Sequence, residues 1–263
     1  MTHTVLVIGR ARTGSTVLRQ CLGSSASSFD LGEVFHADTH LETNFWRFWH
    51  KLSNSNIQFA HPHYLPDVWE KFITYFRRKT GAETLIVDTK VEYLPALRVP
   101  QAGRYWPIFP ANSAGVGSKI IRVYRKNVLA QIVSFCLARR IGEWEAWNLN
   151  APYELQKRNL KRFHFRENAL RKMLKRKILK ENRLAAQGLP TGKFPKGSRL
   201  RLDPDQLVLE IDRVSSEDNA VDTEMGSMIA YKVYYEDIFD NEGMVSSVLL
   251  EGLSKAIFDT AKI

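Results

Sequence analysis

Residues 4–22, TVLVIGRARTGSTVLRQCL, decide the fold predicted for this chain. The apolar run Val5–Ile8 predicts a buried strand, and a glycine-containing loop and a helix follow it. After Gly9 come four residues, a second glycine, and then Ser15 and Thr16, which is the spacing of a phosphate-binding P-loop. Backbone N–H groups at the start of such a helix favour an anion. The stretch therefore predicts an α/β fold with an anion site after its first strand.

The loop departs from the nucleoside-triphosphatase pattern at one position. Ser15 stands where those enzymes carry the lysine that reaches the terminal phosphates of ATP or GTP. Arg10 and Arg12 lie just upstream, and a guanidinium can hold one phosphate or sulfate through two hydrogen bonds. We expect Arg12 to be the main clamp on such a group, whereas Arg10, at the strand end, can instead pair with an acid.

A second basic segment begins at residue 119. The stretch 119–124 predicts a strand, and Arg125 follows at its end. Asn127 is a residue type that caps helices, and apolar residues at a 3.6-residue period predict a helix over 127–140. Ser134 lies on a separate row of small side chains of this helix, where a ligand can approach closely.

Together these segments resemble the nucleotide-binding elements of sulfotransferases that use 3′-phosphoadenosine 5′-phosphosulfate (PAPS). Arg12–Thr16 is similar to the 5′-phosphosulfate loop of bacterial carbohydrate sulfotransferases, in which Arg replaces the usual Lys. The resemblance implies that PAPS binds at the loop and at a 3′-phosphate site, through Arg10, Arg12, Thr13, Gly14, Ser15, Thr16, Arg125 and Ser134. The commoner family spacing would select Lys126 for the 3′-phosphate, so Arg125 and Lys126 both stay candidates.

Two further segments match the family in chain order. The apolar strand 85–90 ends in Asp88 and Lys90, and the resemblance places Lys90 near the sulfonyl group. In a P-loop kinase Asp88 would instead bind magnesium, and a solvated Lys at a sheet edge is the plainest alternative. The missing P-loop lysine favours the sulfotransferase interpretation. Tyr231–Ile238 is similar to the Tyr-Glu-Asp-Leu strand end of many sulfotransferases and is expected to be structural.

Sulfonyl transfer to a hydroxyl needs a base. Glu33 resembles the Glu of the Gly-Glu or Pro-Glu site that deprotonates the acceptor in bacterial carbohydrate sulfotransferases. Desolvation in a pocket can raise the pKa of such a carboxylate, which suits a base. His36 is the rival base, and a surface glutamate without a role is the alternative. No metal is required if basic side chains and loop N–H groups stabilise the developing charge.

Composition indicates a single domain spanning residues 1–263. A chain of this length with 44% hydrophobic and 11% aromatic residues is ordinary for a globular enzyme. No apolar run approaches the roughly 18 residues of a membrane helix, and the early first strand leaves no room for a signal peptide. A cytoplasmic protein is therefore expected, with Cys21 and Cys136 as buried free thiols.

Alternating strands and helices predict a P-loop-type three-layer α/β fold, in which helices flank a central, mostly parallel sheet. Beyond the elements above we expect strands near 29–34 and 228–235. Further helices are expected at 15–22, 41–53, 66–80, 154–186 and 243–259. Residues 188–227 contain glycines, prolines and an acidic run, and they are expected to form an excursion or flap.

The net charge of +10 is concentrated in the segment 157–183. Such a segment can bind nucleic-acid phosphates, contact an anionic membrane surface peripherally, or form a solvated helix face. We favour the solvated face, whose basic field also attracts anionic PAPS, with no obligatory nucleic acid.

The leading functional hypothesis is sulfonyl transfer from PAPS, with PAP as product, to the hydroxyl of a carbohydrate, glycolipid or small alcohol. The alternatives are a P-loop nucleotide kinase and a non-catalytic nucleotide- or nucleic-acid-binding module.

Overall fold

The computed structural model describes residues 3–36, 41–98, 100–101, 104–105, 108–112, 118–141, 204–240 and 245–258. The chain divides into two compact units, one formed by Met1–Gln131 with Leu207–Ile263 and the other by Ile132–Gln206. The helix predicted at 154–186 and the basic segment 157–183 lie outside the described residues. In the part that the structure describes, no helix combines the length and apolar character needed to cross a membrane.

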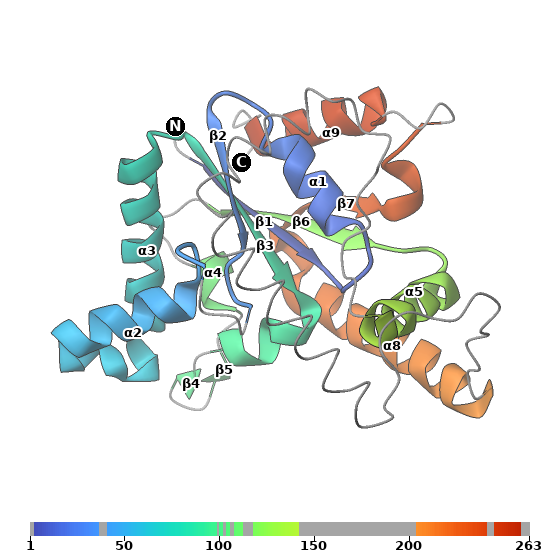
Figure 1. Cartoon of the computed structure of the whole chain (residues 1–263), viewed down its shortest axis with the longest axis horizontal. Helices are drawn as coiled ribbons and strands as arrows, with labels where there is room; N and C mark the ends of the chain where they lie inside the picture. The colour runs from blue at the N-terminus through green and yellow to red at the C-terminus, as the bar shows by residue number, and fades with distance from the viewer. Residues whose placement is uncertain are drawn as a thin grey trace, which may run out of the picture. The chain divides into compact units, whose positions relative to one another are not determined.

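Five parallel strands form the sheet of the first unit, in the order β2-β3-β1-β6-β7 (Figure 1). Their bounds are β1 (His3–Gly9), β2 (Ser28–Glu33), β3 (Thr84–Lys90), β6 (Ser118–Tyr124) and β7 (Ile229–Tyr234). Gly9 pairs with Lys90 on one side and with Val123 on the other, and Glu33 pairs with Asp88. The carboxyl ends of four strands therefore lie side by side at the same end of the sheet. The predicted parallel α/β sheet is confirmed.

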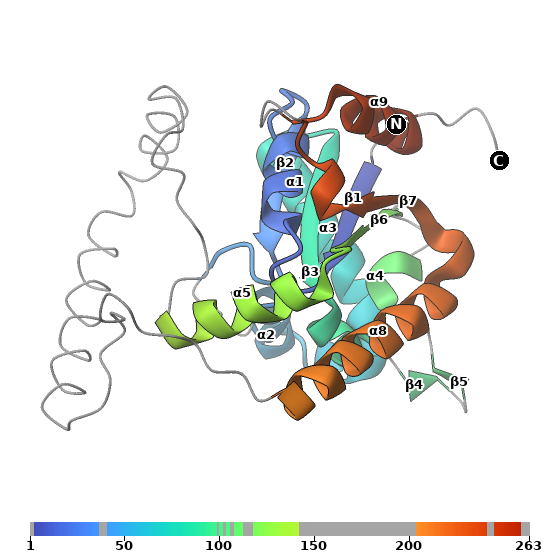
Figure 2. The ribbon, with the colours of Figure 1, turned by 90° about the vertical axis from the view of Figure 1, so that its right-hand side faces the viewer.

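Helices pack on both faces of this sheet (Figure 1 and Figure 2). Val5 and Val7 face α1 (Ser15–Leu22) and α9 (Ser247–Phe258). Leu6 and Ile8 face the other layer, because successive side chains of a strand point to opposite sides. That layer contains α2 (Phe45–Ser55), α3 (Leu65–Thr80), α4 (Phe109–Asn112) and α8 (Pro204–Met225).

Helix α3 shows how the sequence sets one of these layers. Pro66 lies in its first turn, where no N–H is needed. Its buried side chains recur every three or four residues: Leu65, Val68, Trp69, Phe72, Ile73 and Phe76. Gly81 ends the helix with a φ of 68°, a left-handed conformation that glycine adopts without steric cost.

The remaining elements agree with most predicted boundaries. The strand at 119–124 and the helices at 15–22 and 66–80 are confirmed to within one residue, and α5 (Val128–Ile141) confirms the helix at 127–140. Short segments connect the main elements: η1 (Ile57–Ala60), η2 (Pro62–Tyr64), η3 (Val91–Leu97), β4 (Pro100–Gln101), β5 (Arg104–Tyr105), η5 (Gly226–Met228) and η6 (Tyr235–Asp237).

The helix predicted at 41–53 begins later. Asn44 caps α2 by accepting from Arg47 N at 3.0 Å. The two cysteines are free thiols, but Cys21 and Cys136 are half-buried, less than the full burial expected.

Helix α8 lies within the predicted excursion and was not foreseen. Val214, Val221 and Met225 are buried, and Leu207 and Ile211 are half-buried. These residues are spaced by four, three, seven and four positions, which is one face of a helix. Asp218 occupies the position where this repeat would place a further apolar side chain.

Candidate active site

The loop between β1 and α1 depends on two glycines. A Cβ on Gly9 would lie 2.6 Å from Thr13 Oγ1, and a Cβ on Gly14 would clash with the ring of Tyr235. Gly14 also has a φ of 80° and is the residue before α1. The spacing that identified the loop thus has two physical causes, close approach at both glycines and a left-handed backbone at the second.

Hydrogen bonds fix the loop in place. Thr13 donates to the carbonyl of Arg10 through its N–H at 3.3 Å and its Oγ1 at 2.8 Å. Gln131 Nε2, on α5, donates to the carbonyl of Ala11 at 3.0 Å. These bonds use the carbonyls of Arg10 and Ala11 as acceptors, and the Thr13 amide is itself bonded within the loop.

The amides at the start of α1 are the natural donors to an anion. Val17 and Leu18 both donate to the carbonyl of Gly14. The N–H groups of Ser15 and Thr16 precede these bonds and have no intrahelical acceptor. Together with the helix dipole, they favour a negatively charged group at this end of α1.

Arg12 has a strained backbone. Its φ is 70°, and it is the single non-glycine residue with positive φ in the described part of the chain. This conformation costs an L-residue roughly 1–2 kcal/mol. Strain of this kind concentrates at ligand-binding sites, where the surrounding structure maintains it.

Lys90 contacts two predicted site residues, Ser15 and Glu33, together with the buried Asp88. Its Nζ lies 2.7 Å from Ser15 Oγ, 2.8 Å from Asp88 Oδ2 and 3.1 Å from Glu33 Oε1. Ser15 Oγ also donates to Asp88 Oδ2 at 3.2 Å. Because Lys90 is only 7% exposed and β3 is an inner strand, the alternative of a solvated lysine at a sheet edge is wrong.

The charges in this cluster influence one another. Burial alone would lower the pKa of Lys90, but Asp88 and Glu33 outweigh it and hold that pKa above its usual value. Lys90 is therefore a cation at neutral pH. Burial raises the pKa of Asp88, opposed by Lys90 and Arg19. Asp88 is fully buried, and its Oδ1 has no hydrogen-bond partner among the described residues.

Arg19 and Asp30 support the cluster, and sequence reasoning missed both. Arg19 lies one turn after Ser15 on α1, and its guanidinium pairs with Asp30 and, at 3.6 Å, with Asp88 Oδ2. Asp30 also accepts from Gly32 N at 2.9 Å, where the pairing of β2 shifts register. The i, i+4 spacing of Ser15 and Arg19, which places both on one helix face, is the signal that could have identified Arg19.

Glu33 and His36, the two candidate bases, have different surroundings. The carboxylate of Glu33 contacts Lys90, and its side chain is 30% exposed, which leaves it open on one side. His36 is exposed, and its ring packs edge-to-face with Tyr93 at 6.2 Å between centroids. Burial raises the pKa of Tyr93 to about 12, with the charge of Glu33 as the next contribution. His36 therefore packs on Tyr93, whereas Glu33 acts on the same tyrosine through its charge.

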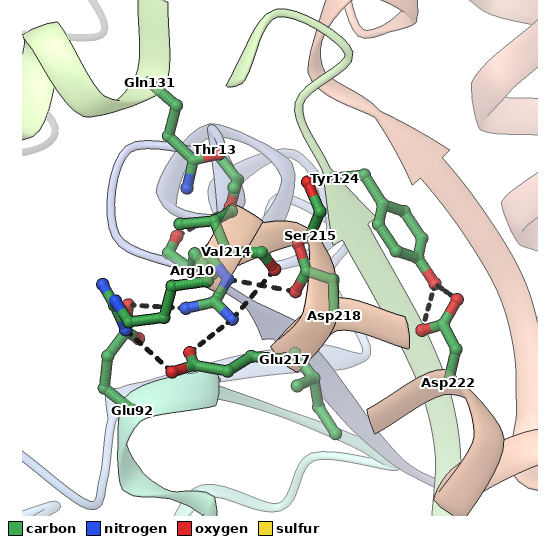
Figure 3. A network of polar contacts seen from close by, with 12 residues as sticks. Arg10, Thr13, Glu92, Tyr124, Gln131, Val214, Ser215, Glu217, Asp218 and Asp222 are labelled. Atoms are coloured by element: carbon green, nitrogen blue, oxygen red, sulfur yellow. Dashed lines mark hydrogen bonds and ion pairs between the residues drawn. The ribbon is translucent and has the colours of Figure 1, made fainter. Parts of the chain in front are cut away.

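Arg10 pairs with acidic side chains, which is the alternative predicted from its position at the end of the strand. Its side chain is 3% exposed, and it forms ion pairs with Glu217 at 2.7 Å and Asp218 at 3.1 Å, with Glu92 farther away at 3.8 Å (Figure 3). A guanidinium enclosed by carboxylates offers little to an incoming phosphate. Arg12 remains the arginine of the loop for that role.

Arg125 and Lys126, the two candidates for the 3′-phosphate, make different contacts. Arg125 Nη1 donates to the carbonyl of Arg12 at 3.2 Å, and its guanidinium stacks on Tyr235, 4.6 Å from the ring centroid. Lys126 Nζ instead pairs with Asp237 at 2.9 Å, on an exposed surface. Arg125 is therefore the one of the two that contacts the loop. Ser134 belongs to the second compact unit.

The Tyr-Glu-Asp segment has a structural role, as expected, and the contacts explain it. Tyr235 packs against Gly14 and Arg125. Glu236 accepts from the N–H groups of Lys126 and Asn127 at 3.0 and 3.1 Å, at the start of α5. This segment joins the loop between β1 and α1 to the helix that follows β6.

Comparisons with known proteins add no family to these observations. No family model matches the chain, and no curated protein or solved structure matches it. The residues and contacts of the site are therefore what supports a function.

Proposed function

We propose that this chain is a sulfotransferase that transfers a sulfonyl group from PAPS to an acceptor hydroxyl of a carbohydrate, glycolipid or small alcohol. The position of Lys90 carries the proposal. Its ammonium contacts Ser15, which stands where nucleoside-triphosphatases have their lysine. A cation from β3 thus lies at the start of α1, next to Ser15, where the loop itself has no lysine.

The donor chemistry of the site fits a phosphosulfate group. The amides of Ser15 and Thr16, the ammonium of Lys90 and the guanidinium of Arg12 are all donors to anionic oxygens. The two glycines keep side chains off the loop. We assign the 3′-phosphate to Arg125. When bound, PAPS would supply an activated sulfonyl group.

Glu33 and Lys90 can act together in the transfer. In this proposal Glu33 takes the proton of an acceptor hydroxyl, since its carboxylate contacts Lys90 and its side chain is still 30% exposed. Protonation of Glu33 cancels a negative charge 3.1 Å from the ammonium. More of the field of Lys90 then acts on charge that develops on the oxygens at the loop.

The same contacts count against the two alternatives. A magnesium-dependent kinase would use Asp88 as its metal ligand, but Asp88 is fully buried and its Oδ2 already accepts from Ser15 and Lys90. A non-catalytic binding module would have no need of a buried lysine that pairs with an open carboxylate.

Calorimetric titration of the full chain with 3′,5′-PAP tests the proposal. PAP should bind without magnesium and raise the melting temperature, since a ligand at 100 times its Kd adds about 2.7 kcal/mol of stability. Radiolabelled transfer from PAPS to a panel of sugars, glycolipids and phenols then identifies the acceptor. A melting temperature that is unchanged by millimolar PAP but rises with Mg-ATP would support the kinase alternative. Salt-dependent RNA or DNA binding without PAP binding would support the module.

A further inference from the structure

One face of α8 is apolar except at Asp218, which contacts Arg10, the residue after β1, and Arg122 of β6. Arg10 Nε lies 3.1 Å from Asp218 Oδ1, and Arg122 Nη2 lies 2.7 Å from the same oxygen. Both arginine side chains are almost completely buried, with exposures of 3% and 0%. A single carboxylate oxygen thus pairs with two buried cations. One of them, Arg10, directly follows Gly9, the first glycine of the loop.

Both arginines are connected to the backbone that leads into the loop. Arg122 Nη1 donates to the carbonyl of Ile8 at 3.1 Å. The carbonyl of Arg10 accepts both hydrogen bonds of Thr13 (Figure 3). A path of direct contacts therefore runs from α8, through Asp218 and Arg10, to Thr13 in the anion-binding loop.

We propose that Asp218 is a positioning residue for the P-loop, which holds Arg10 so that the loop amides keep the geometry required by the sulfonyl donor. This inference rests on the proposed function, because it gives the loop its ligand. The buried guanidinium of Arg10 thereby has a different role from that of Arg12, since it shapes the loop from behind.

The remaining contacts show why loss of Asp218 should alter the loop without unfolding the chain. Arg10 would keep Glu217, at 2.7 Å, and Arg122 would keep Asp222, at 3.3 Å, and the carbonyl of Ile8. Neither cation would be left buried without a carboxylate, which is the arrangement that costs most. What changes is the direction in which Arg10 is held.

Asp222 provides a matched control. It lies one turn after Asp218 on α8, and the two side chains are 24% and 22% exposed. Asp222 contacts Arg122, Tyr124 and Lys232, whereas Asp218 contacts Arg10 and Arg122. Asp218→Asn and Asp222→Asn therefore remove similar charges from the same helix, and only the first weakens a direct contact with Arg10, because an amide keeps one acceptor oxygen but carries no charge.

Two measurements on the full chain test the inference. Hydrogen exchange of the Thr13 amide, without ligand, should be faster in Asp218→Asn than in wild type and unchanged in Asp222→Asn. Titration with PAP should show an affinity lower by about ten- to a hundredfold in Asp218→Asn, because misdirected loop amides lose hydrogen bonds to the anion, and a charge-assisted bond contributes about this much. Asp222→Asn should stay within about twofold of wild type.

Equal Thr13 exchange in both variants would overturn the inference, and so would equal PAP affinity in both. If wild type does not bind PAP, the proposed function fails, and exchange at Thr13 alone decides whether Asp218 positions the loop. Should Asp218→Asn not fold, Arg10→Lys tests the same contact, because one ammonium cannot replace separate donors to Glu217 and Asp218. Unchanged Thr13 exchange in Arg10→Lys would also overturn the inference.

Discussion

Arg12 combines two properties that usually exclude each other. It is the residue we assign to clamp the anion, and its φ of 70° is unfavourable for any residue with a Cβ. Glycine would relieve this strain but has no guanidinium. Under the proposed function, the loop keeps an unfavourable backbone at the residue that carries the clamping charge, which is the pattern expected where strain serves binding.

Substitution of Arg12 separates the side chain from the backbone. Arg12→Gly and Arg12→Ala should weaken PAP binding equally, by roughly 1.5–3 kcal/mol, the value of a charged hydrogen-bonding partner. Arg12→Gly should be the more stable variant by up to about 1 kcal/mol, because glycine accepts positive φ at some cost in unfolded-state entropy. Urea unfolding gives the stabilities and calorimetry gives the affinities. Wild-type affinity in either variant would remove Arg12 from the clamp.

Site residues could be predicted where the chemistry is local to a motif. Glu33 and Lys90 are the last residues of their strands and Ser15 begins a helix, and parallel strands bring such positions together, so that Lys90 contacts both of the others. The partners of Arg10 cannot be predicted from the sequence, because Glu217 and Asp218 lie more than 200 residues away along the chain. No local pattern specifies a contact at that separation.

At the scale of elements, the ends of helices are easier to predict from the sequence than the segments against which the helices pack. Asn127 was expected to cap the helix after β6, and its Oδ1 accepts from Ala130 N at 2.8 Å. Helix α8 escaped prediction because Asp218 interrupts its apolar repeat and the segment before it contains glycines and prolines. The interruption has a cause that only the tertiary structure supplies, the two arginines beneath it.

The cap at Asn127 allows a direct test of how α5 begins. Asn127→Ala should lower the free energy of unfolding by about 1 kcal/mol, since it leaves the Ala130 N–H without its acceptor. Asn127→Ser should retain most of the stability, because a serine hydroxyl can accept the same bond. Chemical denaturation of the three proteins measures the difference. If Ala and Ser variants lose the same amount, Glu236, which binds the adjacent amides, caps the helix alone.

At the scale of the whole molecule, the strands could be predicted but their order could not. Apolar runs identify each strand and the intervening helices make the sheet parallel. The order β2-β3-β1-β6-β7 depends on which strands pair, and that is decided by packing between distant segments. Carboxylates on α8 and after β7 then link these distant segments, since Glu217 binds Arg10 and Glu236 binds the start of α5.

These two glutamates predict how the stability of the first unit depends on pH. Burial opposes ionisation of Glu217, but hydrogen bonds from Arg10 and Arg213 outweigh it and hold the pKa of Glu217 below its usual value. Burial is likewise outweighed at Glu236 by the N–H groups of Lys126 and Asn127, so its pKa is also lowered. A carboxylate with a lowered folded-state pKa contributes stability above its unfolded pKa, roughly 4.3, and loses it as pH falls through the folded value.

Stability should therefore rise with pH in this acidic window, where the unfolded chain binds more protons than the folded one. Glu217→Gln and Glu236→Gln should each flatten that rise, by less than one proton per residue, because glutamine does not titrate. Glu251→Gln, at an exposed position of α9, makes the same change in net charge and should leave the slope as in wild type. Urea midpoints at constant ionic strength, measured from about pH 3 to pH 6, give the slopes. Parallel curves for all four proteins would show that neither ion-paired glutamate is linked to folding, and would leave the general repulsion of a chain with net charge +10 as the source of acid sensitivity.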